Sequence, residues 1–293
     1  MSLVPLDYGS TDDDSEENDH DGESCRGESQ SSSSSKEASA DTDVGYSHSR
    51  TPSTDQLLSS KQSSANIKSS ARRITFHGKA SDVTVSVHEL LDGTYGSFVW
   101  PSALVLSAYV HFLGSAFRGK RVLELGCGTA LPGLVAAKLG AAQVVLTDSG
   151  QLPHVLANTE LAVRANRCEE TCAVAALDWG EFPPLVGDPC AFEYVLGADV
   201  FYEPEMFDTL LATVVYILKK SPPSAAFITA YQERSSRRSV QHLLDRYGLT
   251  CTLVDKADFG GWGGDTWSLV NDAYYSPPRE IASVVLLIIK MVS

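Results

Sequence analysis

A glycine-rich loop is the first feature of this 293-residue sequence that could do chemistry. Residues 124–128 read ELGCG and lie between an apolar run and a helical segment that begins at Leu131. Glycines without side chains let a ligand approach the backbone closely, and free N–H groups at the start of a helix favour an anion. The third glycine of a dinucleotide fingerprint would fall at Leu131, so the spacing disfavours NAD. An ordinary tight turn would also explain a lone glycine pair.

Acidic residues follow the next two expected strands. Asp148 lies 20 residues after Gly128 and could accept hydrogen bonds from two ribose hydroxyls. Its alternative is the N-cap of the next helix. Asp178 could accept a hydrogen bond from a purine amine, and Trp179 beside it offers a flat apolar wall. Their alternative is a loop turn with a buried tryptophan.

A third acidic segment, residues 199–205, reads DVFYEPE. A carboxylate at this strand end could hold an ammonium or guanidinium group. The nearest acids are Asp199, Glu203 and Glu205. We expect Asp199 to orient a substrate and Tyr202 to shape the pocket, although Tyr202 could also be an ordinary core residue.

These motifs need a scaffold that brings strand ends together, and the sequence alternates strand and helix patterns. That alternation predicts an α/β fold with an open, doubly wound, mostly parallel sheet, which binds ligands at the carboxyl ends of its strands. A small hairpin is expected before it, at residues 74–87. Strands are expected at Arg121–Leu125, Gln143–Thr147, Thr171–Leu177, Tyr194–Ala198, Ala225–Ala230, Leu249–Leu253 and Ser283–Val292; helices at Ala103–Phe112, Leu131–Leu139, Gln151–Asn166, Glu205–Lys219 and Arg234–Tyr247.

The first 70 residues differ in composition from the rest. They hold 20 serines and 14 Asp or Glu against 5 Lys or Arg. Sparse apolar residues predict a disordered tail, either a phosphorylatable or partner-binding segment or a tolerated extension. The folded domain is expected at residues 71–293.

Composition also limits which binding partners and which cellular compartment we expect. The net charge is -14 without a block of Lys or Arg, so we do not expect nucleic acid as a partner. No apolar run approaches the roughly 20 residues of a membrane helix, and no secretory signal is visible. We therefore expect a cytoplasmic or nuclear protein with reduced thiols. The spacing of His and Cys predicts no metal site.

The segments FVWPSA, ELGCGTALPGLVAAKLGA, VVLTDS, LDWG and GADVFYEPE occur in this order from Gly93 onward. Together they resemble the seven-strand S-adenosylmethionine methyltransferases. Within these, they resemble the group of protein methyltransferases that includes the lysine methyltransferases with an Asp-x-x-Tyr motif. The resemblance implies a Rossmann-like seven-stranded sheet with an antiparallel last strand. It also implies S-adenosyl-L-methionine as cofactor.

The resemblance assigns roles to matching positions. Glu124, Gly126 and Gly128 would hold the methionine end of the cofactor, and Asp148 the ribose. Asp178 and Trp179 would lie at the adenine, and Trp100 would border the cofactor pocket. Asp199 would lie beside the cofactor and, with Tyr202, near the substrate nitrogen.

The resemblance implies transfer of a methyl group to a protein side chain. Lysine is the target for most of the group and histone arginine for one member, so the target residue stays open. The expected partner is a protein substrate, such as a basic histone. The alternatives are a methyltransferase for RNA or a small molecule and a non-catalytic, cofactor-binding scaffold.

A long stretch, Asp255–Glu280, combines four glycines with large aromatic residues. Long loops in compact domains are often lids or insertions. We expect this stretch to help select the protein substrate through Trp262 or Trp267. The alternative is an insertion without substrate contact.

Overall fold

The computed structural model describes residues 69–78, 81–90, 96–182, 191–232, 240–259, 267–269 and 279–292. All of them belong to one compact unit, Leu58–Ser293. The expected tail lies outside the described residues except for Ser69 and Ser70, which begin strand β1. The described part therefore begins two residues before the expected start of the domain.

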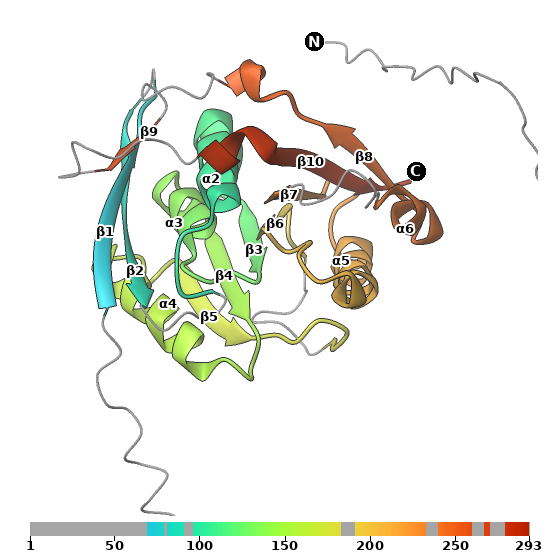
Figure 1. Cartoon of the computed structure of the whole chain (residues 1–293), viewed down its shortest axis with the longest axis horizontal. Coiled ribbons are helices and arrows are strands. Elements are labelled where there is room, and N and C mark those ends of the chain that lie inside the picture. Colours follow the sequence, from blue (N-terminus) through green and yellow to red (C-terminus); the bar gives the residue numbers. More distant parts are fainter. Residues whose placement is uncertain are drawn as a thin grey trace, which may run out of the picture. The chain divides into compact units, whose positions relative to one another are not determined.

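A seven-stranded sheet forms the centre of this unit (Figure 1). Its strand order is β5-β4-β3-β6-β7-β10-β8. Strand β10 runs antiparallel to both neighbours, and the other pairings are parallel. The predicted fold class is thereby confirmed. The strands are β3 (Arg121–Leu125), β4 (Gln143–Asp148), β5 (Cys172–Ala176), β6 (Tyr194–Ala198), β7 (Ala226–Gln232), β8 (Leu249–Leu253) and β10 (Val284–Met291).

Helices cover both faces of the sheet, which explains why its central strands are apolar throughout. Successive side chains of a strand point to opposite faces. Val122 joins the core under α2, α3 and α4, whereas Leu123 joins the core under α5 and α6. The helices are α2 (Pro101–Leu113), α3 (Leu131–Lys138), α4 (Pro153–Ala165), α5 (Phe207–Lys220) and α6 (Gln241–Arg246).

Some helix starts are shifted from the expected ones: α2 starts two residues earlier and α4 two residues later. A 3-10 turn, Pro204–Met206, precedes α5, so this helix starts two residues later than expected. The helix expected from Arg234 is described only from Gln241, and residues 233–239 lie outside the described part.

The expected hairpin is part of a three-stranded antiparallel sheet. Strands β1 (Ser69–Phe76) and β2 (Val83–Leu90) form the hairpin, and β9 (Trp267–Leu269) pairs with β1. The sequence did not predict β9, which places part of the Asp255–Glu280 stretch beside β1. Trp262 lies outside the described residues, so its expected substrate contact stays a prediction.

Helix α4 holds the outer edge of β2 through two asparagine side chains. Asn166 donates from Nδ2 to the Ser86 carbonyl at 2.6 Å and accepts the Ser86 N–H at 2.9 Å. Asn158 donates to the His88 carbonyl at 2.7 Å. These bonds satisfy backbone groups that an edge strand would leave open. They anchor the small sheet on the large one.

The end of β2 then fixes the segment Gly96–Trp100, which precedes α2. The Leu90 N–H donates to the Ser97 carbonyl at 2.7 Å. The Val99 N–H donates to the buried Glu89 carboxylate at 3.0 Å. The small sheet therefore positions the aromatic segment before α2.

Candidate active site

A cavity of about 470 Å³ opens at the carboxyl ends of β3, β4, β5 and β6. This volume lies within the usual range for small-molecule sites. The loops after these strands line it together with the segment Gly96–Trp100. The strand-end motifs thus meet at one place, as the sheet topology predicts.

The glycine loop after β3 forms the floor of this cavity. Gly126 has φ +58°, and a Cβ there would lie 3.2 Å from Val200 Cγ1 and 3.3 Å from Trp179 Cζ2. Any side chain would therefore be strained and would press into the cavity wall. The bare backbone leaves this space for a ligand.

A later glycine, Gly133, explains the unusual spacing of the loop. A Cβ at Gly133 would lie 2.4 Å from Leu146 Cδ2, so this glycine lets α3 pack closely on the sheet. That is the task of the third glycine in a dinucleotide fingerprint. In this chain Gly133 allows that close packing, two residues after the position of the third glycine in the fingerprint.

Glu124, which was expected at the methionine end of a cofactor, lies beneath the glycine loop. Its side chain is fully buried and does not line the cavity. Its Oε2 accepts the Gly133 N–H at 2.8 Å. Burial raises the pKa of Glu124 to about 8, although the Gly133 hydrogen bond lowers it. Glu124 therefore joins the strand to the helix beneath the loop.

Asp148 lies at the end of β4 and does line the cavity. Its Oδ2 accepts the Gly128 N–H at 2.8 Å, and its Oδ1 accepts the Ser149 N–H at 2.8 Å. Burial raises the pKa of Asp148, and these two bonds oppose the rise. A carboxylate has about four acceptor positions. Asp148 can therefore accept two further hydroxyl groups.

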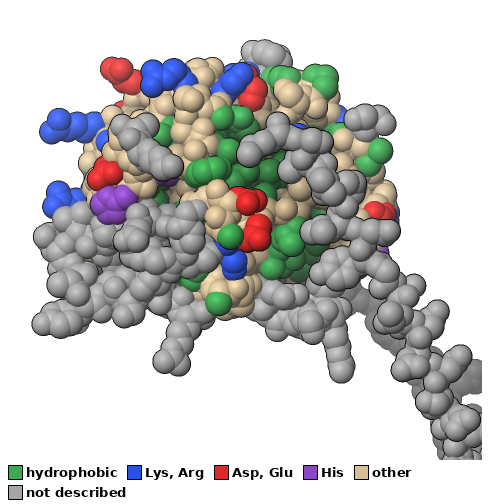
Figure 2. Space-filling model, turned by 90° about the horizontal axis from the view of Figure 1, so that it is seen from above, with side chains coloured by type: hydrophobic (Ala, Val, Ile, Leu, Met, Phe, Trp, Pro, Cys, Tyr) green, Lys and Arg blue, Asp and Glu red, His purple; other side chains and the backbone are tan. Residues whose placement is uncertain are grey.

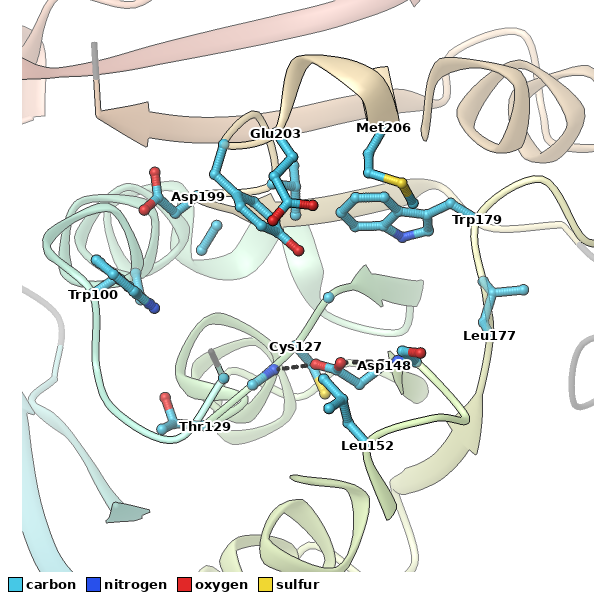
Figure 3. A pocket seen from close by; sticks show the side chains of 18 of the residues that line it. Trp100, Cys127, Thr129, Asp148, Leu152, Leu177, Trp179, Asp199, Glu203 and Met206 are labelled. Carbon is cyan, nitrogen blue, oxygen red and sulfur yellow. Dashed lines mark hydrogen bonds between the residues drawn. The ribbon is translucent and has the colours of Figure 1, made fainter. Parts of the chain in front are cut away.

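Asp178 and Trp179 follow β5 and line the same cavity. Asp178 accepts a hydrogen bond from the Ser149 hydroxyl, which links the ends of β4 and β5. Trp179 lies across the cavity from Trp100 (Figure 3), and the rings of Trp100 and Phe98 have centroids 4.5 Å apart. Aromatic rings thus flank the cavity on two sides.

Asp199 lies at the end of β6 in a left-handed backbone conformation, with φ +57°. Its Oδ1 accepts the Gln232 N–H at 3.1 Å and the Ser102 hydroxyl at 3.4 Å. Asp199 is buried at the cavity wall, and its carboxylate is turned toward α2 (Figure 3). Tyr202 is half-buried and also lines the cavity.

Comparison with known proteins decides the family. Residues 79–244 match a family model described as lysine methyltransferase. The chain is 41% identical over 175 residues to histone-arginine methyltransferase METTL23 of Xenopus laevis, which covers 60% of this chain and 74% of that protein. The chain belongs to the lysine methyltransferase family.

Two further relatives differ in the residue that their names give as target. The Homo sapiens histone-arginine methyltransferase METTL23 is 37% identical over 163 residues, 55% of this chain and 84% of that protein. EEF1A lysine methyltransferase 3 of Xenopus tropicalis is 33% identical over 156 residues, 51% of this chain and 64% of that protein. The names thus include both arginine and lysine methyltransferases.

This chain is an S-adenosylmethionine-dependent protein methyltransferase, and its cavity fits that cofactor. The space beside Gly126 would be filled by any Cβ. The Asp148 carboxylate keeps acceptor positions for hydroxyl groups, and the Trp179 ring offers a flat apolar face in the same cavity. These features suit a sugar hydroxyl pair and an aromatic base.

Several residues of this methyltransferase site were not expected from the sequence. Gly96, Phe98, Thr129 and Met206 all line the cavity, together with Glu203, one of the three acids noted in the sequence. Thr129 directly follows the glycine loop, and the aromatic run before Pro101 was a usable signal for Phe98. Gly96 carried no local signal, because its importance comes from lying against Gly128.

In the described residues, no helix is both long and apolar enough to cross a bilayer. In the same part of the chain, no group of three His, Cys, Asp or Glu side chains could hold a metal ion.

Proposed function

We propose that this methyltransferase methylates an arginine side chain of a basic protein such as a histone. The observation that carries the proposal is that the Gly126–Gly128 loop and the Asp199–Glu203 segment line one cavity. One side of that cavity suits the cofactor, and the other carries aromatic and acidic groups suited to a cation. The relatives named as histone-arginine methyltransferases support arginine as the target.

The proposed cofactor contacts follow from the placement of each side chain. The backbone of Gly126 and Gly128 would hold the methionine end, and Asp148 the two ribose hydroxyls. Asp178 and Trp179 would bind the adenine. Glu124 would support the cofactor site indirectly. Its carboxylate accepts the Gly133 N–H and so fixes the helix that follows the glycine loop.

Trp100 and Asp199 would form the wall nearest to the reacting atoms. Trp100 closes the cavity beside Phe98. Asp199 holds the end of β6 to β7 and α2 through Gln232 and Ser102. It thereby positions Tyr202 three residues later, and Tyr202 would shape the opening for the substrate side chain.

The chemistry requires alignment more than activation. When bound, S-adenosylmethionine supplies a methyl group on an electrophilic sulfonium. Transfer would give the substrate nitrogen a C–N bond in place of the S–C bond, whose electron pair would stay with the sulfur, and the nitrogen would lose one proton to solvent. Holding the nitrogen in place and excluding water would account for most of the rate. Phe98, Trp100 and Trp179 supply the apolar surface that excludes water.

Lysine is the second candidate target, because the family model is described as lysine methyltransferase. A lysine must lose its proton before it can attack, which a desolvating pocket favours. RNA is less well supported. On the face drawn in Figure 2, Lys and Arg side chains lie scattered among acidic and hydrophobic ones rather than in one basic patch.

The experiment that tests the proposal is methyl transfer by the purified full chain. Core histones, total RNA and a cell extract would each be incubated with cofactor that carries a radiolabelled methyl group, and labelled peptides would be sequenced by mass spectrometry. We expect label on arginine. Label on lysine alone would replace arginine with the second candidate. Label only in RNA or small molecules would overturn a protein substrate.

A further inference from the structure

Three acidic side chains near the end of β6 differ in what their carboxylates do. Asp199 is buried, and its Oδ1 accepts hydrogen bonds from Gln232 and Ser102. Glu205 is exposed and does not line the cavity. Glu203 is both exposed and part of the cavity lining. Glu203 is therefore the acid of this group that an incoming side chain would meet.

The Glu203 carboxylate is directed into the cavity from the wall above the glycine loop (Figure 3). Across the described ranges, no hydrogen bond or ion pair joins this carboxylate to another residue. Its charge is thus not neutralised by a neighbour within the part of the chain that the structure describes. A cation that enters the cavity would displace none of the described residues from this carboxylate.

A backbone turn fixes the main chain at Glu203. Pro204 follows directly and begins a 3-10 turn. The Met206 N–H donates to the Glu203 carbonyl at 2.9 Å, which closes that turn. The turn therefore sets the backbone position from which the Glu203 side chain reaches the cavity.

An aromatic residue directly precedes Glu203 and lines the same cavity, namely Tyr202. Figure 3 shows the Trp179 indole, which is proposed to bind the adenine, beside Glu203 and Met206. Aromatic faces attract cations, and guanidinium groups also stack on them. The Glu203 carboxylate together with the Tyr202 ring therefore suits a planar cationic side chain.

We propose that Glu203 is the residue that binds the cationic side chain of the protein substrate and that it favours arginine over lysine. This proposal rests on the proposed protein methylation. A carboxylate can bind two N–H groups of a guanidinium side by side, which leaves the third nitrogen free to point at the methyl group. Beside a lysine, the same negative charge would stabilise the protonated amine and so hinder its attack.

The test compares Glu203→Gln with Glu205→Gln. Each change removes one negative charge from an exposed side chain, and the two positions are two residues apart. Only Glu203 lines the cavity. Binding of an arginine-containing histone-tail peptide would be measured by fluorescence anisotropy with S-adenosylhomocysteine present. KM for core histones and the affinity for S-adenosylmethionine would be measured in parallel, and thermal melting would confirm folding.

We expect Glu203→Gln to weaken peptide binding and raise KM about fivefold, which is the upper range for one exposed ion pair. The loss should shrink at high salt, because screening weakens the wild-type contact. Cofactor affinity should change less than twofold. Glu205→Gln should match wild type in all three measurements, and a peptide with lysine in place of arginine should be less sensitive to Glu203→Gln.

Equal peptide affinity for wild type and Glu203→Gln would overturn the proposal. A fivefold loss of cofactor affinity with unchanged peptide binding would also overturn it, because the carboxylate would then bind the ammonium group of the cofactor. A wild-type chain that methylates no protein at all would refute the proposed function itself. That outcome is distinguishable, because it shows in the wild type before any variant is compared.

Discussion

The carboxylate of Asp148 accepts the backbone N–H of Gly128, with 2.8 Å between Oδ2 and the nitrogen. This bond joins the end of β4 to the loop after β3. A second bond joins the same loop to β4, from the Cys127 N–H to the Thr147 carbonyl at 2.8 Å. The acid proposed to bind the ribose therefore also shapes the loop proposed to bind the methionine end.

Asp148→Ala should weaken binding of S-adenosylmethionine by at least about tenfold. The change removes two proposed ribose hydrogen bonds, and bonds to a charged acceptor contribute about 1.5–3 kcal/mol each. It also removes the acceptor for the Gly128 N–H. Calorimetric titration checks this, with Asp245→Ala as the control, because Asp245 is exposed on α6. Unchanged affinity for Asp148→Ala would remove the ribose assignment.

Gly128→Ala should damage the cofactor site more than an alanine change at an uncrowded glycine that also has a positive φ. Gly128 has φ +50°, and its Cβ would lie 3.2 Å from the Gly96 backbone. Gly114 has φ +51° with no atom within 4 Å of its Cβ. Both alanine variants should lose unfolding free energy, because a positive φ suits glycine and strains alanine.

Only Gly128→Ala should also lose cofactor affinity, because it pushes the segment before Trp100 away from the loop. Urea unfolding and calorimetric titration of both variants would separate the two effects. If Gly114→Ala lost as much cofactor affinity, general destabilisation would explain the result and the close contact at Gly96 would not matter.

The positions of the central strands and of the strand-end acids follow from local patterns in the sequence, whereas the antiparallel last strand was implied by the family resemblance. Each central strand is a short apolar run, and parallel strands end at one edge of the sheet. Asp148, Asp178 and Asp199 each stand directly after such a run, so their meeting at one cavity could be predicted. The burial of Glu124 was also within reach, because it lies between Leu123 and Leu125 in a strand covered on both faces.

Other features depend on contacts between distant residues and carry no local signal. Strand β9 has three residues, and its pairing with Ile74, Thr75 and Phe76 spans most of the domain. The orientation of Asp199 depends on Ser102, which is 97 residues away. No periodicity or spacing around residue 199 could show that its carboxylate holds α2 and β7.

Asp199→Ala should destabilise the fold, whereas Asp199→Asn should not. Asp199 has φ +57°, a conformation that Asn and Asp tolerate better than Ala. Alanine would also leave the Gln232 N–H without its acceptor, which costs about 1–3 kcal/mol in a buried setting. Asparagine keeps an oxygen for this bond.

Urea unfolding of both Asp199 variants checks the prediction, and cofactor affinity measured beside it shows whether the wall keeps its shape. We expect Asp199→Asn to retain near-normal stability and cofactor binding. A loss in Asp199→Asn as large as in Asp199→Ala would show that the negative charge, and not the hydrogen-bond geometry, holds this turn.

Glu124 gives the protein a pH-dependent stability. Burial raises its pKa in the folded state to about 8, from the ordinary value of 4.5. The folded state therefore binds the Glu124 proton more tightly than the unfolded state does. The resulting stabilisation is fully present below about pH 4.5 and is lost as the pH rises to about 8.

Glu124→Gln should remove this dependence, because glutamine stays neutral while its oxygen can still accept the Gly133 N–H. We expect wild type to lose unfolding free energy relative to Glu124→Gln as the pH rises from 5 to about 8. Burial also raises the pKa of Asp148, but both proteins keep Asp148, so their difference isolates Glu124. Urea unfolding at several pH values in this window measures it. A wild-type-to-variant difference that stays constant with pH would show that Glu124 is already charged in the folded protein.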